Sequence, residues 1–346
     1  MSGQMTAGQH WPARDGYRMP AEWAPHRRSW MCWPCRPSAW GTADGLARAR
    51  EATSRVARAI AKFEPVVIAT RPDDAAAAKQ LCGEAAEIFE TPLDDSWARD
   101  IGPTFLKGPG HAGTAWQFNA WGEKYRPYDK DRGFAAGVLE RETARIYRAP
   151  IVCEGGAIHV DGEGTLITTE QCLLNPNRNP RFDRETVAES LARYTGAMHI
   201  PWLGGNFSDQ ETDGHIDNIA CFAAPGRVIL GIPALKSHPD FPAIQAAKRQ
   251  LVQARDVRGE LFEIVEIAQP QKERLDWRGR PLGASYVNFY LVNGGLVMPA
   301  FEDPADAPAR AVLADCFAGR EIVQLDARAI VEGGGGIHCI TQQEPA

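Results

Sequence analysis

The sequence has no long apolar segment. None of its runs approaches the ~20 apolar residues that a membrane crossing requires, and the polar stretch Met1–Trp11 lacks the apolar centre of a secretory signal. Eight cysteines in 346 residues are too few and too irregularly spaced for a disulfide scaffold. We therefore expect a cytoplasmic protein with reduced thiols and no membrane partner.

Basic clusters are also missing. The 38 lysines and arginines are spread along the chain, and 44 acidic residues outnumber them, which gives a formal net charge of −6. Because nucleic-acid-binding proteins usually carry a basic face, we expect no nucleic-acid partner. An acidic balance is compatible with a cationic substrate, although solubility alone can account for a charge of this size.

Helical and strand-like segments alternate along the chain, which predicts an α/β fold. Residues 43–63 have helical spacing, and residues 65–70 have the character of a buried strand. The length favours about two domains. A doubly wound nucleotide-binding fold has this alternation, but no GxGxxG or Walker-type phosphate loop supports it. Asn293-Gly294 predicts a hairpin turn, and residues 107–134 resemble a long, ordered loop packed by aromatic side chains.

Reactive side chains gather in four turn-like or glycine-rich segments, residues 94–103, 153–156, 213–218 and 332–339. In the last of these, Cys339 follows the run Gly333–Gly336, which would let a ligand approach the backbone closely. Cys339 could be a nucleophile if a base or a positive charge lowers its pKa. The alternative is a buried structural cysteine behind a glycine-rich turn.

The other three segments supply an imidazole and carboxylates. His215 and Asp217 would share one face of a strand, and an imidazole is suited to acid/base catalysis; a surface turn is the alternative. Glu154 precedes two glycines and is either a carboxylate in a cleft or an exposed loop acid. Asp100 lies in an acidic segment around Arg99, which we expect to pair with an acid.

Together these residues favour chemistry on a planar cation. A thiol protease needs one orienting group beside its cysteine and histidine, whereas several carboxylates suit a guanidinium, which forks its hydrogen bonds. Asp100, Glu154 and Asp217 could hold such a group. Cys339 could then attack the central carbon, and His215 could protonate the departing ammonia.

Other sites are less favoured. Cys32 and Cys35 form a CxxC motif, but it precedes the first predicted helix instead of opening a thioredoxin-like unit. A zinc site that uses Cys339 and the other candidates has no recognised ligand spacing, so we predict no metal. His338 adjoins Cys339, and since neighbours on a strand face opposite ways, we interpret His338 as structural.

Nine segments carry a resemblance to a known family. They span nearly the whole chain in the family's order, and this makes the match specific. The segments are residues 18–23, 30–34, 97–103, 118–122, 154–162, 168–174, 214–218, 284–289 and 334–345. On these residues the sequence resembles the agmatine deiminases of the guanidine-modifying superfamily, which also holds bacterial peptidylarginine deiminases and arginine deiminases.

The resemblance implies a five-bladed, pseudo-symmetric α/β propeller of ββαβ modules. Residues 1–346 would form a single catalytic domain, with residues 1–12 as a flexible tail. The pocket would lie at the centre of the propeller, and a chain organised around one centre replaces the two domains that length alone suggests.

The resemblance also implies the roles of the reactive residues. Cys339 matches a nucleophile that forms a covalent amidino-thioether intermediate, and His215 matches the general acid/base. Asp100, Glu154 and Asp217 match the carboxylates that hold the guanidinium. No metal or organic cofactor is implied.

The remaining matched positions concern the pocket walls and the substrate. Trp97 would pack against the substrate, and Asn288, Gly334 and Gly335 would line the pocket. The reaction would convert agmatine and water into N-carbamoylputrescine and ammonia, a step towards putrescine. The partner is thus a small cationic guanidino compound, and we expect a homo-oligomer, specifically a dimer.

Two departures from the family pattern keep alternatives open. Residues 123–126 and the compact stretch 269–283 could change recognition of the substrate's far end. Free arginine or peptidyl arginine is therefore an alternative substrate. A non-catalytic guanidinium-binding protein and a thiol amidase are alternatives of other classes.

Overall fold

The computed structural model describes residues 10–346. Its strands are β1 His26–Cys32, β2 Val66–Thr70, β3 Glu87–Glu90, β4 Thr104–Leu106, β5 Ala112–Gln117, β6 Arg145–Val152, β7 Ile158–Val160, β8 Leu166–Thr169, β9 Trp202–Leu203, β10 Ala220–Ala224, β11 Arg227–Ile232, β12 Glu263–Ala268, β13 Tyr290–Val292, β14 Gly295–Ala300, β15 Glu321–Asp326 and β16 Thr341–Pro345. Its α-helices are α1 Ala43–Ile60, α2 Ala75–Cys82, α3 Ala98–Ile101, α4 Ala120–Glu123, α5 Asp129–Arg141, α6 Glu170–Leu173, α7 Arg184–Thr195, α8 Phe241–Gln253, α9 Asp306–Cys316 and α10 Arg328–Val331. The 3₁₀ helices are η1 Pro37–Ala39, η2 Pro72–Asp74, η3 Gly83–Ala85, η4 Gly155–Ala157 and η5 Ile216–Asn218.

The strands of residues 10–346 form five small sheets that share one plan. In the fourth sheet, β10 pairs antiparallel with β11, and α8 then crosses to β12, which pairs parallel with β11. The second sheet (β4-β5-β6), the third (β7-β8-β9) and the fifth (β13-β14-β15) repeat this order of an antiparallel and a parallel pair. The five ββαβ modules expected of a propeller are therefore confirmed.

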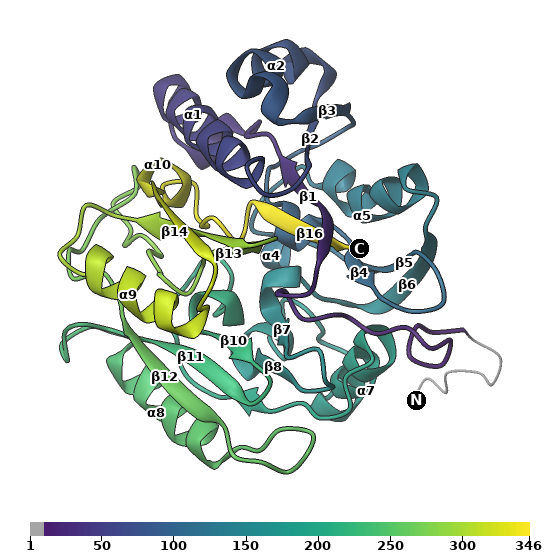
Figure 1. Cartoon of the computed structure of the whole chain (residues 1–346), viewed down its shortest axis with the longest axis vertical. Coiled ribbons are helices and arrows are strands. Elements are labelled where there is room, and N and C mark those ends of the chain that lie inside the picture. Colours follow the sequence, from purple (N-terminus) through teal and green to yellow (C-terminus); the bar gives the residue numbers. More distant parts are fainter. Residues whose placement is uncertain (1–9) are drawn as a thin grey trace.

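The first sheet differs because both ends of the chain build it. Its order is β16-β1-β2-β3, so β16 supplies the antiparallel partner of β1. The main-chain N–H of Ala346 also donates to the carbonyl oxygen of Pro25 at 2.9 Å. Figure 1 shows β16 and the C-terminus near the middle of the molecule, beside β1. The ring of modules is thus closed by a strand pair that joins distant parts of the sequence.

The longer helices cover the outside of the ring, while the strands lie nearer its centre (Figure 1). Local sequence explains where several of them begin and end. The side chain of Asp183 accepts from Thr186 N at 2.9 Å and caps α7, which ends at Gly196 in the left-handed region with φ +79. Strands such as β2 are buried on both faces, as its unbroken apolar run requires.

The aromatic segment 107–134 is ordered, as predicted, but it is not a loop. It contains β5 and α4 and runs into α5. The side chains of Trp116, Phe118 and Trp121 are buried in it. These elements were not predicted from the sequence, because glycine and proline are frequent in this segment and normally interrupt helices and strands.

The hairpin predicted at Asn293-Gly294 is confirmed, since β13 and β14 pair with Val292 opposite Gly295. The tail predicted for residues 1–12 falls largely on residues 1–9, which lie outside the described residues. Within the described part, Trp11 already lies under the guanidinium groups of Arg14 and Arg193, 5.5 and 4.6 Å from its ring centre. In residues 10–346 no helix has the length and apolar character needed to cross a membrane.

Candidate active site

The predicted site residues all lie in connections between one sheet and the next. Asp100 lies between the first and second sheets, Glu154 between the second and third, His215 and Asp217 between the third and fourth, Asn288 between the fourth and fifth, and Cys339 between the fifth and first. Each connection between two neighbouring sheets thus contributes at least one polar side chain to the predicted site at the centre of the ring. The ring, and not nearness in sequence, brings these residues together.

Asp100 is held in place by two hydrogen bonds. The indole Nε1 of Trp121 donates to its Oδ2 at 2.8 Å, and the main-chain N–H of Gly156 donates to its Oδ1 at 3.0 Å. Burial raises the pKa of Asp100, and although His215 opposes this shift, the nearby Asp217 and Glu154 carboxylates support it. This carboxylate is fixed in orientation and responsive to the charges around it.

Trp121 reaches Asp100 from an unusual turn. Ala120, Trp121 and Glu123 have φ values of 54, 55 and 62, all in the left-handed region that residues other than glycine rarely adopt. The Asn119 side chain supports the turn, because it accepts from Gly122 N at 2.9 Å and donates to Asn177 O at 2.8 Å. The strained backbone is what directs the indole at Asp100.

Glu154 is fully buried and paired with a buried arginine. The Nε of Arg178 donates to Glu154 Oε1 at 2.6 Å, and Nη1 of the same guanidinium lies 2.7 Å from Asp213 Oδ2. Burial is the largest single influence and opposes the charged carboxylate, but Arg178 and His215 together outweigh it and hold the pKa of Glu154 at about 2. Glu154 is therefore ionised under all ordinary conditions.

His215 lies between two of the carboxylates without hydrogen bonding to either. Its Nδ1 is 3.8 Å from Asp100 Oδ1, and its Nε2 is 3.9 Å from Glu154 Oε2. The imidazole is fully buried, and neither ring nitrogen has a hydrogen-bond partner among the described residues. Burial is the largest single influence and disfavours the imidazolium, yet the negative charge of Asp100 and the contacts with Cys172 and Glu154 together raise the pKa of His215 well above its usual range. A charged but unanchored imidazole can transfer protons.

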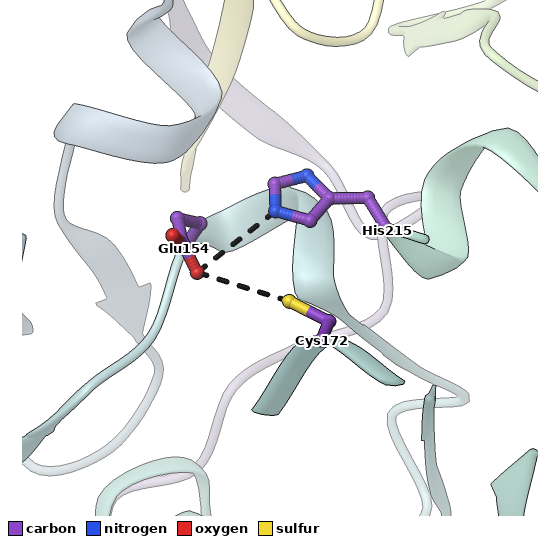
Figure 2. A group of neighbouring side chains, drawn as sticks. All are labelled: Glu154, Cys172 and His215. Carbon is purple, nitrogen blue, oxygen red and sulfur yellow. Dashed lines mark hydrogen bonds and ion pairs between the residues drawn. The ribbon is translucent and has the colours of Figure 1, made fainter. Parts of the chain in front are cut away.

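Cys172, which the sequence analysis did not select, completes this corner of the site. Figure 2 shows Glu154, Cys172 and His215 pointing towards one another. Their ligand atoms lie within 4.8 Å of one another, a spacing that suits a metal ion. Arg178 already binds Glu154 and places a positive charge there, and burial together with Glu154 raises the pKa of Cys172, so this thiol keeps its proton. A metal ion would have to compete with the guanidinium of Arg178 for the Glu154 carboxylate, so these residues fit an acid/base pair better than a metal centre.

Cys339 lies in the turn between α10 and β16. Its Sγ is 3.6 Å from Asp217 Oδ2, and Nδ2 of Asn288 approaches it to 3.3 Å. Burial raises the pKa of Cys339 well above its usual range, and the charges of Asp217 and Asp100 add to this effect. Oδ1 of Asp217 is buried and has no partner among the described residues.

Gly156 marks the space between these groups. A Cβ at this position would lie 2.6 Å from Nδ1 of His215 and 3.0 Å from both Oδ1 of Asp100 and Oδ2 of Asp217. Any other residue here would occupy the point on which the imidazole and two carboxylates converge. Glycine at this position is therefore what allows the imidazole and the two carboxylates to lie so close to the main chain and to one another.

The glycine run before Cys339 forms one wall. A Cβ at Gly335 would lie 2.6 Å from the Trp97 ring and 3.0 Å from Cys339 Cβ. Trp97 is buried and stacks on Trp40 at 6.0 Å between ring centres. Gly334 has φ +110 and would place a Cβ 3.5 Å from Oε2 of Glu211. These positions lie beside the thiol, where the resemblance places the pocket wall.

Two interpretations from the sequence are wrong. His215 and Asp217 do not share a strand face, because Asp217 lies in η5 and His215 is its N-cap. His338 is not isolated from the site by strand alternation, since it precedes β16 and its Nδ1 lies 2.9 Å from Asp217 Oδ2. The turn alternative for residues 213–218 was nearer the observed geometry.

Several contributing residues were missed. Gly156 and Trp121 stand inside segments that the resemblance used, so their motifs were a usable signal. Glu22 also stands inside such a segment, residues 18–23, whereas Arg178 lies outside all nine and only the fold reveals it. Arg99, predicted to pair with an acid, does so with Glu22 at 3.3 Å.

Fold and site together define the class of thiol-dependent hydrolases that act on amidine-like groups, built on a five-module ring. The chain belongs to the Porphyromonas-type peptidyl-arginine deiminase family, whose model matches residues 18–345. It is 42% identical to an agmatine deiminase of Stutzerimonas stutzeri over 99% of each chain, and 42% identical to one of Pseudomonas aeruginosa over 97% of each. A solved structure described as agmatine deiminase of Enterococcus faecalis catalysing its reaction superposes with a TM-score of 0.93, at 34% identity over 98% of each chain.

Proposed function

We propose that the protein hydrolyses the guanidinium group of agmatine to N-carbamoylputrescine and ammonia, which supplies a precursor of putrescine. The observation that carries the proposal is one cluster of buried reactive groups. His215, Asp100 and Asp217 surround Gly156, Glu154 lies 3.9 Å from His215, and Cys339 lies 3.6 Å from Asp217. The agmatine deiminases that are 42% identical over nearly the whole chain support the choice of substrate.

Binding is proposed to prepare the nucleophile. Asp100 and Asp217 accept the N–H groups of the guanidinium, with the unpartnered Oδ1 of Asp217 among the acceptors. The pKa of Cys339 is raised by burial and by these two carboxylates. A guanidinium placed between them cancels that negative field, so substrate binding favours loss of the thiol proton.

The proposed chemistry has two halves. The Cys339 thiolate attacks the guanidinium carbon, the His215 imidazolium donates a proton to one nitrogen, and ammonia leaves as a covalent amidino-thioether forms. His215 is then neutral and accepts a proton from water as the oxygen attacks the same carbon. The carbon–sulfur bond breaks, the product keeps the water oxygen as its carbonyl, and the remaining proton returns the thiolate to the thiol. The proton that the thiol lost on binding leaves with the ammonia, so the sum is guanidinium and water in, carbamoyl product and ammonium out.

An acidic side chain beside the glycine run of the site supports an amine at the far end of the substrate. Glu211 lies beside Gly334, and its carboxylate is bonded to Arg280 and to the hydroxyl of Tyr125. An acidic group here would attract the ammonium of agmatine and repel the carboxylate that free arginine carries in addition. We therefore infer that agmatine is preferred over arginine.

A substrate panel tests the proposal. Agmatine, arginine and arginine peptides are incubated with purified protein, and ammonia and the carbamoyl product are measured. We expect turnover of agmatine, and Cys339→Ser should reduce it by roughly 10³-fold or more. Cys316→Ser is the matched control, because Cys316 lies in α9 away from the site. Faster turnover of arginine or its peptides would overturn the choice of substrate, and binding without turnover would identify a guanidinium-binding protein.

We further propose a cytoplasmic location, a homodimeric assembly and a single catalytic domain over residues 1–346. The cationic substrate and the ring closed by β1 and β16 are compatible with all three. Sedimentation of the purified protein would test the dimer.

A further inference from the structure

His338 is a second buried histidine between two carboxylates. Its Nδ1 lies 2.9 Å from Asp217 Oδ2, and its Nε2 lies 2.8 Å from Glu22 Oε1. All three side chains are almost completely buried. A neutral imidazole has one N–H donor and one acceptor, so it could satisfy only one of these oxygens and would repel the other. Two contacts of hydrogen-bond length to ionised carboxylates therefore require a doubly protonated ring.

Glu22 is held ionised by the side-chain nitrogens around it. The Nη1 of Arg99 lies 3.3 Å from its Oε1, and the Nε2 of His159 lies 3.7 Å from its Oε2. Burial opposes the charge of Glu22, but His338, Arg99 and His159 together hold its pKa well below the usual range. Glu22 comes from the segment before β1, so it connects the start of the described chain to the loop of the nucleophile.

Asp217 is the second carboxylate that His338 contacts, on the side of the ring opposite Glu22. Its Oδ2 faces both His338 and Sγ of Cys339, the latter at 3.6 Å, which leaves Oδ1 without a protein partner. The main chain of His338 is fixed too, because its N–H donates to Asn288 Oδ1 at 2.9 Å. The imidazolium thus decides which oxygen of Asp217 is available for substrate.

We propose that His338 is a positioning residue, held as an imidazolium by Glu22, which orients Asp217 and keeps it ionised beside Cys339. This inference rests on the proposed deiminase reaction, in which Asp217 binds the guanidinium. The role differs from that of His215, because His338 transfers no proton during the reaction.

The charged groups that face His338 act in both directions. Asp217 and Glu22 favour its protonation, whereas burial and the positive charge of Arg99 oppose it; the carboxylates prevail and the pKa of His338 is raised. His159 stacks on its ring at 6.5 Å between centres. Since His338 lowers the pKa of Asp217 against the effect of burial, its removal should let Asp217 take up a proton at higher pH.

Two substitutions of His338 separate positioning from packing. His338→Asn keeps a donor near the position of Nδ1 and can still bond Asp217, whereas His338→Gln keeps a donor near Nε2 and can only bond Glu22. We expect His338→Gln to raise KM for agmatine by roughly 10- to 100-fold, with a smaller change in kcat, because a hydrogen bond to the charged Asp217 is lost. We expect His338→Asn to recover most of that KM.

The pH profile gives a readout that packing alone would not change. In both His338 variants the acid limb of kcat/KM should move to higher pH. Glu22→Gln removes a carboxylate that raises the pKa of His338, so His338 should lose its proton at lower pH and the alkaline limb should move down. His159→Gln is the matched control, since His159 also faces Glu22 but does not contact Asp217.

The outcomes are distinguishable. A wild-type protein that does not turn over agmatine counts against the proposed function. Wild-type turnover with equal KM values and unshifted limbs in His338→Asn, His338→Gln and Glu22→Gln overturns the positioning role, whatever happens to the melting temperatures. Should the His338 variants fail to fold, the alkaline limb of Glu22→Gln decides the matter.

Discussion

The two histidines of the site share a charge environment but differ in their contacts. His215 lies 3.8 and 3.9 Å from Asp100 and Glu154, while His338 lies 2.9 and 2.8 Å from Asp217 and Glu22. Both rings are buried, and the carboxylates raise the pKa of both. Only His338 has its nitrogens satisfied by the protein.

This difference separates a residue that reacts from one that supports. A buried polar group without a partner is rare and destabilising, so its presence indicates a constraint other than stability. His215 keeps both nitrogens available to substrate and water, whereas the hydrogen bonds of His338 fix its ring and its proton. The surrounding charge sets the protonation of both histidines, and the hydrogen bonds determine which one can exchange its proton.

The largest expected effect comes from removing the imidazole that reacts. His215→Asn should lower kcat by about 10²- to 10⁴-fold, because general acid/base catalysis contributes that much. His338→Gln, in contrast, should act mainly on KM. Steady-state kinetics with agmatine measure both, and equal kcat losses in the two variants would contradict the assigned difference.

The next largest effect on activity is expected when a side chain is added at Gly156, beside His215. Gly156→Ala would place a methyl group 2.6 Å from Nδ1 of His215, so kcat/KM should fall by roughly 100-fold as the guanidinium is displaced. Gly133→Ala is the control, because nothing lies within 4 Å of a Cβ there. An active Gly156→Ala enzyme with unchanged KM would show that the substrate is held elsewhere.

A smaller effect is expected at the carboxylate beside His215. Trp121→Phe removes a hydrogen bond that lowers the pKa of Asp100, so Asp100 should protonate at higher pH and the acid limb of kcat/KM should move upward. At neutral pH kcat/KM should fall roughly tenfold. Trp116→Phe loses a comparable bond, to Thr104 at 2.8 Å, and should leave the limb in place.

The last prediction concerns the stability of the fold, and we expect the smallest effect on activity from it. The pKa of Glu154 is lowered from 4.5 to about 2, so its ionisation stabilises the fold above its ordinary pKa and this contribution is lost as the pH falls through about 2. The contribution is about 3 kcal/mol. Urea unfolding at several pH values should show that Glu154→Gln is less stable at neutral pH and depends less on pH in the acid range. Glu84 is exposed, so Glu84→Gln should unfold like wild type at every pH. A Glu154→Gln plot of unfolding free energy against pH that runs parallel to the wild-type plot would contradict the expectation.

Much of the fold was predictable where local physics determines it. Helix spacing and proline predicted α1 and β2, and an Asn-Gly pair predicted the β13–β14 hairpin. Periodicity gave the α/β class but not the five modules, because their sequences have diverged while each keeps the same strand pairing. The resemblance supplied the propeller.

The predicted site residues lie close together, but the residues that hold them in place could not be predicted from the sequence. Cys339, His215 and Asp217 carry recognisable chemistry among glycines, so sequence could select them. Arg178 and Glu22 act through contacts with Glu154 and His338, residues far away along the chain. Nothing local in the sequence encodes such partnerships, because the ring creates them.

The pairing of β16 with β1 has a consequence for synthesis. Until residues 341–345 emerge from the ribosome, one edge of β1 lacks its partner, and Cys339 has only just been added to the chain. A nascent chain that has completed its other sheets therefore carries neither the thiol nor the closed ring. Thiol, imidazole and carboxylates come together only when β16 closes the ring, so a nascent chain that stops before Cys339 lacks the proposed reactivity.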